Sequence, residues 1–147
     1  MKDRQTGLMF SPVPTDYLSF VWDSVSKVLK KSVATAEGKY EVDDLFNCIM
    51  EDEIVLWIVV DHDKDDEIIA AITTRLINYP RGRSMGMDWI GGTRMKEWLP
   101  MVQDVISRYA KDHNCKYLEG YGRKGWGRWL DKYGWKPDYI AYKMELS

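Results

Sequence analysis

The stretch of sequence that decides the fold lies near the end of the chain and reads Gly122-Arg123-Lys124-Gly125-Trp126-Gly127-Arg128-Trp129-Leu130-Asp131-Lys132-Tyr133-Gly134-Trp135-Lys136. Its aromatic residues recur at helical spacing, which predicts a short helix over residues 124–133 that ends at Gly134. Strands are expected on both sides of this helix, at 115–122 and at 137–146, and the second of them alternates along its length. The end of the chain is therefore expected to form a strand, a short helix and a final strand.

A long amphipathic helix is predicted just before this region. Its apolar face is formed by Met95, Trp98, Leu99, Val102, Val105, Ile106 and Tyr109. Pro100 lies inside the pattern, so the helix either begins at Pro100 or is kinked there. Asn114 can end the helix in a left-handed conformation.

The first part of the chain predicts one strand, two helices and three further strands. They fall at about 7–14, 16–31, 41–51, 54–61, 68–77 and 84–90. Pro12 and Pro14 would confine the first strand to a sheet edge or end it. Thr15 or Asp16 is expected to cap the helix that follows. With no repeat and no linker, the sequence predicts one domain over residues 1–147.

Composition narrows the range of functions. The chain has 147 residues and a formal net charge of -2, so general attraction to nucleic acid or to an anionic membrane is not favoured. Its longest apolar run, residues 54–60, is too short to span a bilayer, and its start has no signal-type apolar region, so a cytoplasmic location is expected. Cys48 and Cys115 lack metal-ligand spacing and are expected to be free thiols, and no metal site is indicated.

The order of these elements, together with the Gly134-Trp135 step and the alternating final segment, resembles the GNAT superfamily of N-acetyltransferases. The resemblance covers most of the chain and is strongest over residues 54–146. It implies an α/β (α+β) fold with a mixed, mostly antiparallel sheet flanked by helices, in the order β-α-α-β-β-β-α-β-α-β. It also implies a V-shaped opening where the fourth strand (84–90) diverges from the fifth (115–121).

Acetyl-CoA is the substrate that this resemblance implies. In the family, its pantetheine arm pairs with the edge of the fourth strand, and the turn and helix start after that strand hold its pyrophosphate. The corresponding residues are Trp89, Ile90, Gly91, Gly92, Thr93, Arg94 and Met95. Arg123 and Lys124 are further candidates for contacts with CoA phosphates, and ordinary surface charge is the alternative explanation for the basic residues. Thr93 is compatible with a simple helix cap.

Catalytic candidates follow from the chemistry of acetyl transfer. A base must take a proton from the attacking amine, and an acid can protonate the leaving thiolate. Asp88 in the fourth strand and Glu119 in the fifth are the candidate bases, and Tyr121 at the mouth of the opening is the candidate acid. The alternative is that both carboxylates lie on solvated strand faces.

Two functional hypotheses remain open at this point. The first is an acyl-CoA-dependent N-acetyltransferase that acts on an amine by direct attack. The second is a catalytically silent GNAT-like protein, either a virion component or a binder of a host protein, because Gly122 to Trp126 also resemble a step in degenerate GNAT-like proteins of tailed phages. The two adjacent glycines depart from the family's turn, and Leu130 stands where the family often has a tyrosine acid. A homodimer is compatible with an edge strand and many aromatic residues.

Overall fold

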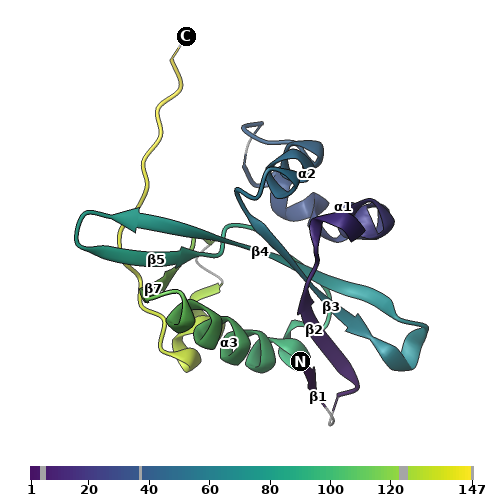
Figure 1. The fold of residues 1–147 in the computed structure, drawn as a ribbon. Helices are drawn as coiled ribbons and strands as arrows, with labels where there is room; N and C mark the ends of the chain where they lie inside the picture. Colours follow the sequence, from purple (N-terminus) through teal and green to yellow (C-terminus); the bar gives the residue numbers. More distant parts are fainter. Residues whose placement is uncertain (4–5, 37, 123–125, 147) are drawn as a thin grey trace.

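Strand-forming residues assemble into a seven-stranded sheet in a computed structural model of the protein (Figure 1). The structure describes residues 1–3, 6–36, 38–122 and 126–146. The strands are β1 (Lys2–Asp3), β2 (Leu8–Pro12), β3 (Val55–Asp61), β4 (Glu67–Tyr79), β5 (Gly82–Gly86), β6 (Ile90–Gly92) and β7 (Cys115–Glu119). Their spatial order is β1-β2-β3-β4-β5-β7, and β6 pairs with β4. Only the β5–β7 pairing is parallel among the described pairs, which confirms a mixed, mostly antiparallel sheet.

Helices cover both faces of this sheet (Figure 1). They are α1 (Leu18–Ala34), α2 (Val42–Met50), α3 (Met95–Asp112) and α4 (Gly127–Leu130), with short 3-10 turns at Thr15–Tyr17, His62–Lys64 and Asp131–Tyr133. The start of α2 is fixed by a capping box, in which the side chains of Glu41 and Asp44 each accept a hydrogen bond from the other's backbone N–H. Asn114 follows α3 with a left-handed φ of 62°, as predicted.

Two apolar clusters form the core, one on each side of the sheet. Leu29 of α1, Leu45 of α2 and Ile58 of β3 belong to the first cluster. Phe10 of β2 and Trp98 of α3 belong to the second. The helices therefore bury the apolar face that their 3.6-residue period predicts.

The predicted final strand is not present. Residues 135–146 have no regular secondary structure, and Figure 1 shows this part of the chain leaving the body and ending away from it. Ile140 and Tyr142 are largely exposed, at 72% and 89%. Alternation supplies the side chains of a strand, but a strand also needs a backbone partner. None of the described strands pairs with this segment.

The structure also decides between the alternatives left open in two local predictions and corrects a third. The first strand is not at an edge, because β2 pairs with both β1 and β3, and Pro12 ends it. Neither Thr15 nor Asp16 caps α1, which begins at Leu18 after a 3-10 turn and has no side-chain cap. The long helix begins at Met95 rather than at Pro100, so Pro100 lies inside it.

Candidate functional site

A β-bulge between β5 and β6 opens the sheet. β4 pairs with β5 as far as Arg75↔Gly86 and with β6 from Ile72↔Ile90, so two residues of β4 (73–74) face three residues of the opposite strand (87–89). The extra residue breaks the predicted continuous strand 84–90 and bends the chain back onto β4. The Met87 N–H still donates to the Glu119 carbonyl at 2.9 Å, which makes it the last backbone link before β6 and the segment after β7 separate.

Asp88 lies in this bulge and forms an ion pair with Arg75 of β4. Arg75 and Glu119 both align with Gly86 of β5, so their side chains share one face of the sheet. A Cβ at Gly86 would lie 3.0 Å from the Ile77 Cδ1 and 3.4 Å from the Arg75 Cγ, so a side chain there would crowd both residues. The hydrogen bond from Arg75 to Asp88 is the main cause that raises the pKa of Arg75, and the charges of Asp88, Tyr121 and Glu119 add to it. Asp88 is therefore paired directly with Arg75, and Glu119 and Tyr121 lie near enough to act on it through their charge.

Two tyrosine contacts complete the cluster. The Tyr79 hydroxyl donates to the Glu119 Oε1 at 2.7 Å, and this bond raises the pKa of Tyr79. The hydroxyls of Tyr121 and Tyr139 lie 3.2 Å apart, and the hydrogen bond between them raises the pKa of Tyr139 to about 12. Tyr79, Tyr121 and Tyr139 are each at least half exposed, so this face of the sheet is open to solvent.

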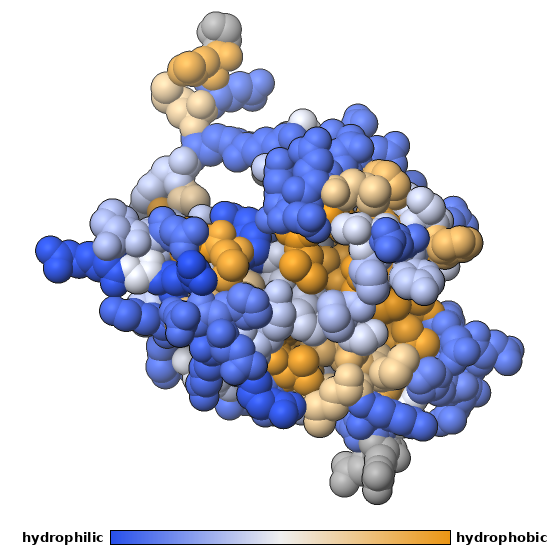
Figure 2. Space-filling model, in the orientation of Figure 1, coloured by the Kyte–Doolittle hydropathy of each residue, from blue (hydrophilic) through white to orange (hydrophobic). Residues whose placement is uncertain are grey.

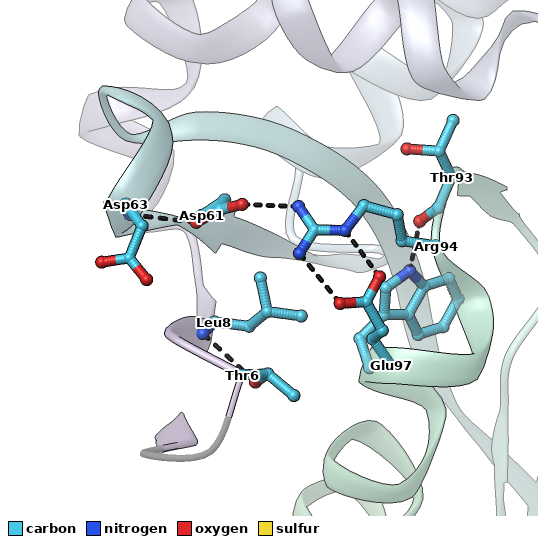
Figure 3. Close-up of polar contacts among 8 residues, drawn as sticks. Thr6, Leu8, Asp61, Asp63, Thr93, Arg94 and Glu97 are labelled. Atoms are coloured by element: carbon cyan, nitrogen blue, oxygen red, sulfur yellow. Dashed lines mark hydrogen bonds and ion pairs between the residues drawn. The ribbon is translucent and has the colours of Figure 1, made fainter.

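The start of α3 lies on the far side of the opening and is held by Arg94. This residue has a left-handed φ of 61° and precedes the first helical residue. Figure 3 shows its guanidinium between two carboxylates, Asp61 at the end of β3 and Glu97 in the first turn of α3. The Asp61 side chain is only 3% exposed and also accepts a hydrogen bond from the Asp63 N–H at 3.0 Å. Arg94 therefore joins the end of β3 to the beginning of α3.

The overall architecture is shared with acetyltransferases of known structure. A GNAT family acetyltransferase from Staphylococcus aureus superposes with a TM-score of 0.68 at 11% identity, covering 95% of this chain and 99% of that one. A protein described as a predicted acetyltransferase, solved with acetyl-CoA, from Clostridium acetobutylicum gives 0.66 at 15% identity, covering 94% and 96%. An aminoglycoside acetyltransferase from an uncultured soil sample, in complex with sisomicin, gives 0.68 at 8% identity, covering 99% and 100%.

The chain has the GNAT acetyltransferase fold. No protein-family model and no curated protein matches the sequence. The expected fold class is confirmed, and the bulge and the opening beside it lie where the resemblance implied the divergence of two strands.

The adjacent glycines do not form the turn that the resemblance implied. Both belong to β6, and each lies where a side chain would collide with backbone. A Cβ on Gly91 would lie 2.2 Å from the Val28 carbonyl oxygen of α1, and one on Gly92 would lie 2.3 Å from that of Ile69. Gly92 also has a φ of 137°, which side-chain-bearing residues rarely adopt. The glycines thus let β6 approach α1 and β4, and their predicted contact with the pyrophosphate stays a prediction.

Thr93 and Arg94 are also engaged by the protein itself. The Thr93 N–H donates to the Ile69 carbonyl at 2.9 Å, and its side chain makes no cap to α3. Hydrogen bonds from Arg94 hold the pKa values of Asp61 and Glu97 below their usual ranges, so both carboxylates remain charged beside it. Since two carboxylates balance one guanidinium, Arg94 is poorly placed to supply a free positive charge to a phosphate.

Two lysines that the sequence did not single out lie closer to the anion-binding end of α3. The Lys96 Nζ in the first turn of α3 lies 5.1 Å from the ring centre of Trp129, and the Lys132 Nζ lies 5.8 Å from the same ring. Trp129 belongs to α4, so the two ammonium groups flank the junction of α3 and α4. Unpaired backbone N–H groups and the helix dipole at the start of α3 add to their positive charge.

The other residues predicted to contact the cofactor lie in the bulge, in β6, at the start of α3 and outside the described residues. The Trp89 carbonyl accepts from the Thr73 N–H at 2.9 Å, and the Trp89 ring packs edge-on against Tyr40 from the loop between α1 and α2. Ile90 aligns with Ile72 of β4, and among the described strands β6 pairs with β4 alone. Met95 is the first residue of α3. Arg123 and Lys124 lie outside the described residues.

The opening is a surface feature rather than an enclosed cavity. Of two cavities of about 450 and 230 Å³, Arg75 lines the smaller, but neither is lined by Asp88, Glu119 or Tyr121. Cys48 and Cys115 are free thiols, as expected. Within the described ranges, no group of three or more potential metal ligands comes together, and no helix is long and apolar enough to cross a membrane.

Proposed function

We propose that the chain is an acetyl-CoA-dependent N-acetyltransferase that transfers an acetyl group to an amine by direct attack. One observation carries the proposal: the opening created by the bulge is bordered by a carboxylate and a tyrosine, Glu119 and Tyr121, whose side chains lie near one guanidinium. A base and an acid beside an open strand edge are what acetyl transfer from a thioester to an amine requires. The proposed site of action is the cytoplasm, the host's if the chain is encoded by a phage.

The edge of β6 suits the extended arm of acetyl-CoA, whereas the residues expected to hold its phosphates are engaged in other contacts. β6 has a strand partner on one side only, so Ile90 can offer a backbone edge to an extended arm, whereas the N–H and C=O of Trp89 are both bonded to Thr73. Lys96 and Lys132 are suited to the phosphates at the start of α3. Gly91, Gly92 and Arg94 are occupied by packing and ion pairs, so the proposed phosphate contact moves from the β6 turn toward the junction of α3 and α4.

Glu119 is the proposed base and Tyr121 the proposed acid. The amine nitrogen forms a bond to the thioester carbonyl carbon, and the bond from that carbon to sulfur breaks. Glu119 takes the proton that the nitrogen loses, and the Tyr121 hydroxyl supplies a proton to the leaving thiolate. Asp88 is already paired with Arg75, so we assign it to positioning Arg75 rather than to proton transfer.

A second function is favoured by a different observation. Arg94 is neutralised by Asp61 and Glu97, and the two glycines at 91–92 are packed against backbone, so the phosphate-binding features expected from the resemblance are engaged in holding the fold. A GNAT scaffold that no longer binds acetyl-CoA would serve as a binder of a host protein or as a virion component. Its open, tyrosine-rich face would then contact a protein.

Calorimetric titration with acetyl-CoA separates the two functions. The acetyltransferase proposal expects a micromolar Kd, with desulfo-CoA as an unreactive analogue that binds similarly. Lys96→Glu should weaken binding on the order of tenfold or more, because it reverses a charge beside the phosphates. Lys111→Glu is the matched control, since Lys111 is exposed in the last turn of α3, at the opposite end of the helix from Lys96. Absence of binding at millimolar acetyl-CoA would reject the acetyltransferase proposal and favour the second function, a GNAT scaffold that contacts a protein.

A further inference from the structure

The segment 137–146 has the side-chain pattern of a strand but no partner among the described strands. Its apolar residues alternate in sequence and would share one face of an extended chain. They are Ile140, Tyr142, Met144 and Leu146, and they are 72%, 89%, 79% and 81% exposed. Figure 2 shows apolar groups on the arm that projects from the body. So many large apolar side chains in solvent on one short segment indicate a surface that is buried in another state.

The open edge of β7 is the complementary feature. β7 is last in the spatial order of the sheet, and β5 is its only strand partner in the described structure. The Glu119 carbonyl points toward β5, where it accepts from the Met87 N–H. Backbone groups alternate along a strand, so the N–H and C=O of Leu118 point to the opposite, open side. An added strand would find unsatisfied donors and acceptors there.

Partly buried apolar side chains at the border of the core also match the segment. Leu118 of β7, Trp129 of α4 and Trp135 are only partly buried, and they form the border of the apolar cluster that contains α3. A strand added beside β7 would place its apolar face next to this border and complete it. Its other face carries Lys143 and Glu145 and would lie beside Tyr117 and Glu119, on the solvent side of the sheet.

We propose that two copies of this chain form a dimer by strand exchange, in which residues 139–146 of each copy pair with the β7 edge of the other. The direction of the segment favours a second copy over its own β7. Tyr139 is fixed by its contact with Tyr121, and from there the segment runs outward and ends away from β7 (Figure 1). Reciprocal exchange satisfies both edges at once and closes the assembly with twofold symmetry. The inference is independent of acetyl-CoA binding.

Light scattering coupled to size-exclusion chromatography tests the dimer. The intact chain should elute with twice the mass of one copy at micromolar concentration. The double substitution Tyr142→Lys and Met144→Glu should weaken dimerisation at least tenfold, because it places charges on the apolar face. The Tm at low concentration should not change, since both side chains are exposed in the single copy. Glu145→Gln on the other face is the matched control and should remain dimeric.

Isotope-mixed crosslinking tests the exchange itself. Unlabelled and ¹⁵N-labelled copies are mixed, allowed to exchange and treated with an amine-reactive crosslinker that joins Lys116 of β7 to Lys143 of the segment. Crosslinked peptides that combine the two labels are expected, and Lys116→Arg should remove them. Crosslinks confined to one label would show that the segment closes on its own β7 and would overturn the proposal. A purely monomeric chain, or a dimer that survives the double substitution, would overturn it as well.

Discussion

The two halves of the sheet differ in how many of their faces are covered by helices. The half formed by β2, β3 and the first part of β4 has α1 and α2 on one face and α3 on the other (Figure 1). The half formed by the end of β4 with β5 and β7 packs against α3, while its other face exposes Tyr79, Tyr117 and Tyr121. Each half has an Arg–Asp pair that ties one segment to another, Arg94–Asp61 in the first and Arg75–Asp88 in the second.

The two pairs have the same chemistry but different surroundings. The Asp61 side chain is 3% exposed, whereas those of Asp88 and Arg75 are 19% and 37% exposed. A buried charge that water cannot solvate needs its ion-pair partner to remain stable. A partly exposed pair is also solvated by water, so the pair contributes little to the stability of the fold. The covered half therefore uses its ion pair to join β3 to α3, and the open half uses its pair to arrange side chains that solvent and ligands can reach.

The largest expected effect belongs to the covered half. Gly92→Glu should prevent folding, because its Cβ would lie 2.3 Å from the Ile69 carbonyl oxygen and its φ of 137° is unfavourable for glutamate. Circular dichroism should show loss of the cooperative thermal transition. Gly127→Ala is the control, since a Cβ there meets nothing within 4 Å. A folded Gly92→Glu protein would show that β6 tolerates displacement, and the two halves would then differ less than their packing indicates.

The next effect concerns activity in the open half. Glu119→Gln should lower kcat/KM on the order of 100-fold or more once an amine acceptor is found, because the amide cannot take the proton from the amine. Its Tm should remain close to that of the unmodified chain, since the side chain lies on the open face. Tyr79→Phe removes only the hydroxyl that donates to Glu119 and should cost much less. Equal losses in both variants would assign Glu119 to positioning rather than to proton transfer.

Asp61→Asn should lower the Tm by several degrees at neutral pH, because it leaves Arg94 with Glu97 as its only carboxylate partner. Arg94 lowers the folded-state pKa of Asp61, so the stabilisation is complete above the unfolded pKa of about 3.9 and is lost as the pH falls through the folded pKa. The difference in Tm between the two proteins should therefore shrink below about pH 4. Asp104→Asn, in an exposed pair with Arg108, should change neither quantity. A Tm difference that does not vary with pH would exclude the ion pair as its source.

The smallest effect on stability is expected for the second pair. Arg75→Gln should shift the Tm by less than Arg94→Gln does, because both Arg75 and Asp88 retain contact with water. Chemical denaturation of the two variants side by side gives the comparison. If Arg75→Gln were the more damaging of the two, the open half would depend on its ion pair for folding, and the contrast between the halves would fail.

The sequence predicted elements whose signals are local. The helix expected at 41–51 is observed as Val42–Met50, because the acidic residues that cap it lie within its own first turn. The bulge was missed because alternation continues through 84–90, and only pairing with β4 reveals the extra residue. The prediction of a final strand was wrong for a related reason, since a strand needs a pairing partner that its own residues do not specify.

In the candidate site, too, local signals could be predicted from the sequence and contacts between distant residues could not. The positions of Glu119 and Tyr121 beside the opening could be predicted because they follow from the order of the strands, and their catalytic roles stay predictions. The carboxylate partner of Arg94 was not foreseen, because Asp61 lies 33 residues earlier in the chain. Lys96 and Lys132 were missed because their common neighbour, Trp129, connects helices that are distant in sequence.

The bulge at residues 87–89 has a consequence for how such a protein can change over evolutionary time. The opening exists because three residues stand opposite two, so its existence depends on the number of residues and not on their identity. Substitutions can replace every side chain around it and leave the gap in place, whereas the deletion of a single residue would restore the ladder and remove it. A lineage can therefore lose or exchange its chemistry by point mutation while it inherits the same shape.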